Sequence, residues 1–505
     1  MKRIVIYYIV ISLLGLGSSS CENWLDVNPK SEIKADKLYE TESGFKDALI
    51  GLYIGMTHSN AYGANLSWQT IEFMACQYQN DKNSFVELQR CNYEHGSSKS
   101  FIDGTWAKLY NVIAESNLLL ESLEKNGHLL NPTVYNVVKG EALAVRAMCH
   151  FDLIRLFAKG NLKGNKAALS DLCVPYVTQY SKSITSQKSY AETLKLLHQD
   201  INDALKCLQS DPLYPGEIQR PEDYEDITNN VFFAGNIAKG RETRLSYPAV
   251  LLLNARVYLW EGNETEALQQ AEELIAAYGQ YVVKGKKKWA NAGGDVDATD
   301  DKLRDYVFKG ELLFALDAQK LEDRIQNAYP ESINGVVNND RLVQSRDFVE
   351  GLFNAPLAGE TDLRFKKHWE QATGNVYLTV KVRKTQGTLY YNYLPLMRIS
   401  EAYLIAAECL ETTNKEKSIG YLNFLKEKRN IQPIHFLGQD ISKEELHKAI
   451  ILDYRREFSQ EGQLFFCYKR LGLKTFTGMQ FQGDMEDAQY QLPYPAIESE
   501  LGQRN

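Results

Sequence analysis

The chain lacks the short motifs that mark the common enzyme classes. Its eight histidines form neither an HxxxH nor an HExxH pattern, so the sequence predicts no zinc-protease helix. No GxSxG segment presents a serine nucleophile, and no cysteine lies in a known nucleophile motif. The segment from Gly160 to Lys166 resembles a phosphate loop only in its glycines, because its spacing is wrong and no Ser or Thr follows it. We therefore expect no cofactor and no metal. Paired carboxylates for sugar hydrolysis are left open, because such pairs are separated in the sequence.

Cysteine is scarce and shows no ligand pattern. The chain has 8 cysteines, without a CxxC pair or the spacing of a metal site. Cys149, Cys409 and Cys467 lie in apolar helical patterns, where small buried side chains are expected. Cys76 and Cys91 are the two that could pair, and the sequence leaves that question open.

An excess of positive charge is also absent. The 57 basic and 65 acidic residues give a net charge of −8, and no long block of either sign occurs. Because nucleic-acid binding needs a clustered positive field, no nucleic acid is expected as a partner. The acidic segment 295–301 offers oxygen ligands but lacks the bidentate glutamate and the turn glycine of a calcium loop, so a solvated loop is the favoured interpretation.

Long apolar runs are rare, and the clear example opens the chain. Two basic residues precede an apolar run from Ile4 to Leu16, and small residues follow before Cys21. This is the order of a secretory signal, and the run is shorter than the roughly 20 residues that span a bilayer. A cysteine at this point is where bacterial lipoproteins are cleaved and acylated, so we expect residues 1–20 to be a signal peptide and Cys21 to be lipidated. An ordinary secretory signal with a chance cysteine is the alternative, since Ser18 stands where lipoprotein signals usually have leucine.

What the sequence does contain is helical periodicity over most of its length. Apolar residues at spacings of three and four predict helices at 42–56, 105–123, 132–158, 190–208, 246–260, 264–278, 395–411, 415–429 and 442–466, whereas residues 57–104 are expected to be largely irregular.

Two of these helices have the pattern of a tetratricopeptide repeat. Pro248 fits the first turn of a helix, and Gly262 separates that helix from the next. Ala255, Tyr258 and Ala267 follow the small and large alternation of such repeats, and residues 400–429 form a looser pair. Two unrelated helical hairpins are the alternative interpretation.

The pattern changes between residues 280 and 394. Glycine and aspartate become frequent there, and the alternation from Val376 to Val382 predicts a strand. We interpret this stretch as an irregular lobe within one large domain of residues 21–505. Helical pairs mainly at 42–56, 105–278 and 395–470 form its scaffold, and the fold class is mostly α.

Aromatic residues outside the helices are the candidate ligand-binding residues. The chain has 30 tyrosines and 6 tryptophans, more than a plain helical core requires. Sugar rings present apolar CH faces ringed by hydroxyls, so their sites combine flat aromatic side chains with hydrogen-bonding groups. Packing is the alternative role for each residue taken alone. The candidates are Tyr62, Trp68, Tyr78, Asn80, Asp81, Trp289 and Trp369.

Several segments match the pattern of one known protein family. Lys139–Ala158 (KGEALAVRAMCHFDLIRLFA) is the most distinctive internal match. The segment Tyr454–Gly472 is also similar, although Asp453–Arg456 departs from the family's Glu-Arg pairing and Cys467 stands where Asp is common. Further matches lie at Cys21–Pro29, Ala48–Tyr53, Trp106–Tyr110 with Asn117, Pro395–Glu408 and Leu492–Glu498. Together these segments resemble the SusD/RagB family of outer-membrane nutrient-binding lipoproteins.

The resemblance implies a tetratricopeptide-like scaffold with an irregular α+β ligand-facing lobe. It also implies a lipid anchor on the extracellular face of the outer membrane, and a SusC-like TonB-dependent transporter that the protein covers as a lid. The expected ligand is an oligosaccharide or polysaccharide, taken up as a nutrient, without catalysis. A peptide or glycoconjugate ligand, a surface glycoside hydrolase and a transporter subunit without its own ligand are the alternatives.

Overall fold

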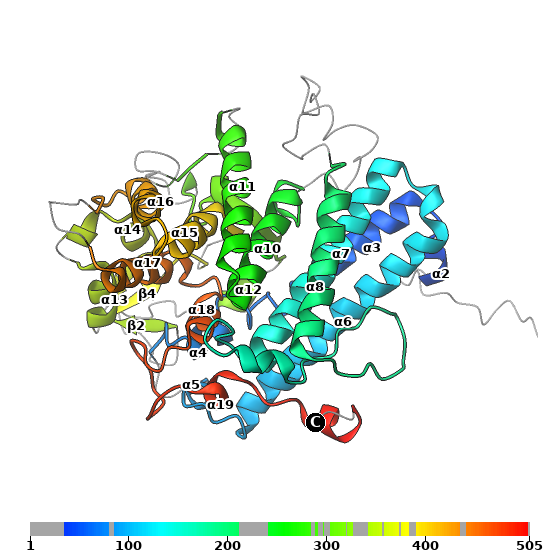
Figure 1. The fold of residues 1–505 in the computed structure, drawn as a ribbon, viewed down its shortest axis with the longest axis horizontal. Coiled ribbons are helices and arrows are strands. Elements are labelled where there is room, and N and C mark those ends of the chain that lie inside the picture. The colour runs from blue at the N-terminus through cyan, green and yellow to red at the C-terminus, as the bar shows by residue number, and fades with distance from the viewer. Residues whose placement is uncertain are drawn as a thin grey trace, which may run out of the picture.

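The computed structural model describes residues 35–79, 85–211, 241–283, 288–290, 296, 303–319, 321–326, 342–355, 358–372, 375–382, 390–434 and 441–502. Helices make up most of this described part (Figure 1). The predicted signal peptide, Cys21, Asn80 and Asp81 lie outside the described residues, as does all of segment 295–301 except Val296.

Four long helices form the N-terminal half of the scaffold: α3 (Glu42–Met56), α6 (Gly96–Asn126), α7 (Pro132–Phe157) and α8 (Tyr190–Leu208). Helix α7 packs against both α6 and α8, and α3 packs against α6 and α7. A side-chain cap at the first turn fixes the start of all four helices, as in α8, where Ser189 and Glu192 form a capping box. The predicted bounds of α3 and α8 are confirmed.

Two further helical pairs continue the stack. The predicted repeat pair is confirmed as α10 (Tyr247–Glu261) and α11 (Glu264–Val283), which pack against each other. Gly262 ends α10 with a φ of 73°, a left-handed conformation that glycine adopts without steric cost. The looser pair is α15 (Ile399–Leu410) and α16 (Lys415–Lys428), and α15 lies against α11.

The sequence prediction was wrong at two helix starts. Residues 395–398 belong to strand β5 (Tyr393–Arg398) and not to a helix, because Pro395 pairs with Ala315 of strand β1 (Leu312–Asp317). Helix α6 begins at Gly96, inside the stretch expected to be irregular, where the His95 side chain accepts the N–H of Ser97.

The last predicted helix is two helices. Helix α17 (Lys443–Phe458) ends before a turn, and α18 (Leu464–Leu471) follows it. Gly462 lies in that turn with a φ of 72°, which a continuous helix does not accommodate.

Two small antiparallel sheets are formed by strands that lie between α11 and α15 in the sequence. Strands β1 and β5 form the first sheet. In the second, β4 (Val376–Thr379) lies between β2 (Val343–Ser345) and β3 (Trp369–Ala372). The predicted strand at 376–382 is therefore confirmed over its first four residues.

Short elements complete the described part. They are α2 (Ala35–Leu38), α4 (Thr70–Met74), α5 (Val86–Gln89), α12 (Leu321–Gln326), α13 (Arg346–Phe353), α14 (Leu363–His368), α19 (Asp487–Tyr490) and α20 (Ala496–Glu500), with 3-10 turns at Gly127–Leu129, Lys166–Ser170, Arg241–Thr243, Lys309–Glu311 and Ala358–Thr361.

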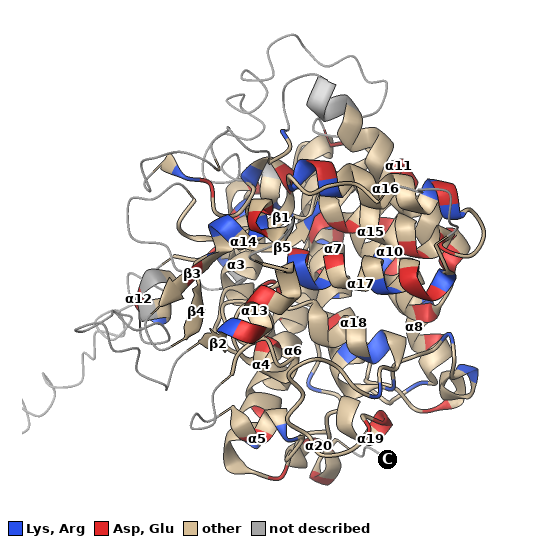
Figure 2. Cartoon of the chain, turned by 90° about the vertical axis from the view of Figure 1, so that its left-hand side faces the viewer, with Lys and Arg blue, Asp and Glu red and all other residues tan. Residues whose placement is uncertain are grey.

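One large buried cluster of apolar side chains runs through both the helical scaffold and the β1–β5 sheet. Figure 2 shows basic residues mixed with acidic ones along the helices, as the sequence predicted. Among the described residues, no helix is both long enough and apolar enough to cross a membrane.

Candidate functional site

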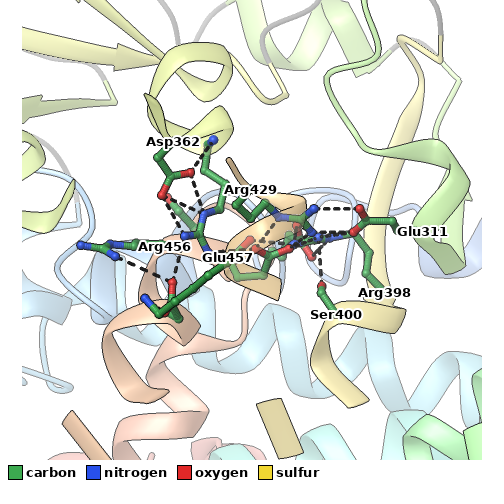
Figure 3. Close-up of polar contacts among 12 residues, drawn as sticks. Glu311, Asp362, Arg398, Ser400, Arg429, Arg456 and Glu457 are labelled. Carbon is green, nitrogen blue, oxygen red and sulfur yellow. Dashed lines mark hydrogen bonds and ion pairs between the residues drawn. The ribbon is translucent and has the colours of Figure 1, made fainter. Parts of the chain in front are cut away.

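A network of buried charges lies where the lobe meets the helical scaffold (Figure 3). Its members come from the 3-10 turn just before β1, from β5 and the start of α15, from α14 and the residue before it, from the segment after β4, and from α16, α17 and the residues that follow them. The network therefore joins segments that are distant in the sequence. All are nearly or fully buried. The network comprises Glu311, Asp362, Arg364, Lys381, Arg398, Ser400, Lys426, Arg429, Asp453, Arg456, Glu457 and Glu461.

Glu457, near the end of α17, is the centre of this network. Its carboxylate accepts from Arg429 at 2.6 and 3.0 Å and from Arg364 at 3.1 Å. Arg398 donates to it as well. Arg429 also binds Glu311 through two nitrogens, at 2.8 and 2.6 Å. Bidentate pairs of this kind fix the guanidinium planes as well as neutralising the charge.

The neighbouring arginines keep the Glu457 carboxylate ionised despite its burial. Burial by itself would raise the pKa of Glu457, but Arg429 and Arg398 offset it and hold that pKa well below its usual range. Burial lowers the pKa of the nearby His368, and Lys381 and Arg398 lower it further, so this imidazole stays neutral. A buried, fully paired set of charges offers no acid or base to a substrate, so the network positions the lobe rather than performing chemistry.

No candidate metal centre is found in the described part of the chain, where no three His, Cys, Asp or Glu residues are placed to hold an ion. Cys76 and Cys91 do not pair, and every cysteine in that part is a free thiol. Burial raises the pKa of Cys76 to about 12 and that of Cys91 to about 11, which makes both thiols poor nucleophiles.

His150 lies in the interior, on the apolar helix α7. Its Nδ1 lies 3.0 Å from the carbonyl oxygen of Arg146, and its Nε2 accepts the N–H of Val177 at 2.9 Å. The ring stacks on Tyr176, with 3.8 Å between centroids. Burial, aided by the charge of Arg146, lowers the pKa of His150 to about 3, so the ring is a neutral packing element.

Three of the predicted ligand residues lie together, but inside the protein. Tyr62, Trp68 and Tyr78 are 2%, 1% and 1% exposed. Their polar atoms bond internally, as when Tyr62 donates to Asp152 at 2.6 Å and Tyr78 donates to the carbonyl oxygen of Trp68 at 2.8 Å. Covered faces cannot stack on a sugar, so this burial corrects the expectation of exposed platforms. Their part in ligand binding stays an untested prediction.

The two remaining tryptophans lie in separate clusters. Trp369 of β3 is 6% exposed and packs with Val349 and Tyr377 in a small core of its own. Trp289 is only partly buried, and it meets the rings of Tyr403 and Phe424 edge-on at 5.4 and 5.1 Å. The structure therefore does not bring the predicted tryptophans into one site.

The structure also has a surface hollow that the sequence did not predict. It has a volume of about 410 Å³ and is lined by Cys91, Asn92, Tyr93, Glu94, Ala488, Gln491, Leu492, Pro493 and Tyr494. We call it the C-terminal hollow. Tyr93 belongs to the stretch 57–104, which the sequence predicted to be largely irregular. Nothing in the sequence indicates that residues 488–494 lie beside Tyr93.

Family models match both ends of the chain. A model described as "Starch-binding associating with outer membrane" matches residues 23–220, and one described as "SusD family" matches residues 361–498. The chain belongs to the SusD/RagB family. The resemblance seen in the sequence is thereby confirmed, as is the mostly helical SusD-like fold.

Two curated SusD-like relatives, both from Formosa agariphila, match over shorter stretches. SusD-like protein P25 is 22% identical over 173 residues, covering 31% of this chain and 30% of the relative. SusD-like protein P38 is 28% identical over 210 residues, covering 41% and 38%. The chain thus spans about a third of the length of these relatives.

Solved SusD-like structures match nearly end to end. A SusD-like carbohydrate binding protein from Bacteroides vulgatus has a TM-score of 0.66 at 17% identity, with 92% of this chain and 97% of that chain covered. A SusD superfamily protein from Bacteroides thetaiotaomicron has a TM-score of 0.61 at 20% identity, with 92% and 98% covered. At these identities the likeness establishes the fold of this SusD-like chain.

Proposed function

We propose that this SusD-like protein captures oligosaccharide or polysaccharide fragments at the bacterial surface and passes them to a SusC-like TonB-dependent transporter. The supporting observation is the family match at both ends of the chain, one model being described as starch-binding and associated with the outer membrane. The solved structure described as carbohydrate binding, which shares the fold, agrees with this ligand class.

The buried carboxylates of the charge network are not open to a substrate. Glycoside hydrolysis needs two carboxyl groups flanking a bond that the substrate can bring between them. Glu311, Glu457 and Glu461 are buried at 0%, 1% and 1% exposure and are paired with arginines, so none of them can serve in this way. Sugar release from an oligosaccharide by the pure protein would establish the hydrolase alternative.

The proposed location follows from the first residues of the sequence. An apolar run of signal-peptide length precedes Cys21, and acyl chains on that cysteine would hold the protein to the outer membrane with its body outside the cell. There it would cover the transporter as a lid. Replacing Cys21 with serine should move the protein from the membrane fraction to the soluble one, whereas unchanged membrane association would refute the anchor.

Among the aromatic candidates in the described part, Trp289 is the one whose ring is partly exposed. It remains a proposed ligand contact, together with Asn80 and Asp81. A Trp289→Ala variant should weaken sugar binding while the helical content stays unchanged.

The function is tested by calorimetry on the soluble form that begins after Cys21. Soluble α- and β-linked glucans and mixed peptides would be titrated separately. Saturable heat with one polysaccharide class supports the proposal, and saturable heat with peptides alone refutes the choice of sugar. Silence in both series, with co-purification of the transporter, would favour a subunit without its own ligand.

A further inference from the structure

The C-terminal hollow is lined by residues on and beside α19, and Figure 2 shows α19 together with α5 and α20 at one end of the molecule. None of its lining residues belongs to the buried charge network. Two segments form its walls: residues 91–94, just before α6, and residues 488–494, near the end of the chain. Its volume of about 410 Å³ falls in the roughly 300–1,000 Å³ range of sites that bury small ligands.

Hydrogen bonds fix both walls in place. Tyr93 donates its hydroxyl to the carbonyl oxygen of Gln489, which ties one wall directly to the other. The backbone N–H of Leu492 donates to the carbonyl oxygen of Leu156 at 3.0 Å. The side-chain amide of Gln491 donates to the carbonyl oxygen of Phe157 at 2.9 Å. The C-terminal wall is thus attached to the end of α7. A hollow held in this way is already formed before a ligand enters, which lowers the entropic cost of binding.

The lining combines flat rings with hydrogen-bonding groups. Tyr93 and Tyr494 are both half-buried, and the second ring is supported edge-on by Trp106 at 5.4 Å. Asn92 and Glu94 are exposed beside them. One N–H of the Asn92 amide binds Glu87 at 2.7 Å, which leaves its second N–H for another acceptor.

Glu94 can also accept from a ligand. Glu94 forms an ion pair with Lys99 at 2.7 Å, but the Glu94 side chain is 82% exposed and the Lys99 side chain is 54% exposed. Such a pair is weak in water, so the carboxylate remains open to a hydroxyl donor. Tyrosine rings match the apolar CH faces of a sugar, and the amide and carboxylate match its hydroxyls. A charged ligand finds no buried counter-ion among the nine lining residues.

We propose that the C-terminal hollow is a binding subsite for a short, uncharged saccharide segment. This proposal rests on the proposed function for the class of ligand. It does not rest on that function for the position of the subsite, because none of the nine lining residues is among the candidates chosen from the sequence. A second contact of this kind would let one long glycan touch the protein at two separated points, and linked contacts raise the overall affinity above that of either alone.

The test fills the hollow without disturbing the core. Ala488, on α19, is exposed and lines the hollow, so Ala488→Trp places an indole inside it. Asn92→Ala removes one hydrogen-bonding group from its rim. The matched control is Ala276→Trp, which puts the same ring on an exposed alanine of α11, at the far end of the molecule (Figure 1).

Each variant of the form beginning after Cys21 is titrated by calorimetry with maltohexaose, cellohexaose and mannohexaose, and separately with the mixed peptides. We expect Ala488→Trp to raise the dissociation constant for the bound hexasaccharide at least about tenfold and Asn92→Ala to raise it about threefold to tenfold, as expected for a lost hydrogen bond. The control should bind like the wild type.

The outcomes of these titrations distinguish the subsite from the proposed function. Wild-type binding that neither hollow variant changes would overturn the subsite and leave the proposed function standing. No binding of any hexasaccharide by the wild type would overturn both. Peptide binding that is lost only in Ala488→Trp would show that the hollow takes peptides and would overturn the saccharide assignment. Equal circular dichroism spectra, together with the milder Asn92→Ala change, separate these results from misfolding.

Discussion

Replacing Glu457 with glutamine should destabilise the protein strongly. The substitution keeps the shape of the side chain but removes one negative charge that faces Arg364, Arg398 and Arg429 in the interior. Removing one partner of a buried ion pair costs about 3–5 kcal/mol, because the remaining charge stays buried without compensation. Glu311 still neutralises part of the charge on Arg429, and the glutamine oxygen still accepts one hydrogen bond. We therefore expect the free energy of unfolding to fall by an amount near the lower end of this range, about 3 kcal/mol.

Urea unfolding at pH 7, followed by far-ultraviolet circular dichroism, measures this loss. Glu444→Gln is the matched control, because Glu444 is an exposed residue of the same helix, α17. That change should alter the free energy of unfolding by less than about 0.5 kcal/mol. A loss below about 1 kcal/mol for Glu457→Gln would refute the view that this carboxylate holds the network together.

The same variant should also change the response to acid. Because the arginines hold the folded pKa of Glu457 below its unfolded value, its contribution is present above the unfolded pKa of about 4.3. It is lost as the pH falls through the folded pKa. The stability difference between wild type and Glu457→Gln should therefore be full at pH 7 and shrink in strong acid. A difference that grows on acidification would contradict the assigned pKa direction.

Four further measurements test other parts of the structure. Gly462→Ala forces a φ of 72° on alanine and puts its Cβ 2.3 Å from a backbone oxygen, so it should cost at least about 2 kcal/mol in urea unfolding. At Gly51, inside α3, an added Cβ has no other atom within 4 Å, so Gly51→Ala should raise the free energy of unfolding by about 0.5–1 kcal/mol. The hydrogen bond to Glu411 raises the pKa of His447, so the loss of stability in His447→Gln should be full below about pH 6.5 and vanish as the pH rises through the folded pKa. The ¹⁵N chemical shifts of the His150 ring, measured by NMR, should be those of a neutral imidazole at pH 5. Shifts of a protonated imidazolium at that pH would contradict the burial of the ring.

The helical scaffold was predictable because its signals are local. Helix α8 has an amphipathic face and a capping box, and Gly262 marks the turn between two repeat helices. Strand β5 was not predictable, because its apolar residues run directly into α15 and its status as a strand depends on pairing with β1, some eighty residues earlier. Local periodicity carries no information about such a partner.

The candidate site was less accessible to prediction for a related reason. Irregular segments usually lie on the surface, and that expectation selected Tyr62 and Trp68 as ligand platforms. Here the segment passes through the interior, with its backbone and hydroxyl groups bonded internally. The C-terminal hollow needs Tyr93 beside Tyr494, and only the folded chain brings these two together.

The turn between α17 and α18 has a consequence for the order in which the chain can fold. The amide of Gln460 donates to the Tyr78 hydroxyl at 3.0 Å, and the N–H of Gly462 donates to Glu72 at 2.8 Å, across 382 and 390 positions. Contacts between such distant positions form slowly, since a very long loop must close before they are made. The interior around Glu72 therefore stays incomplete until the last part of the chain has been synthesised. A protein cut before residue 458 would lack these closing contacts and should be degraded rather than accumulate as a stable fragment.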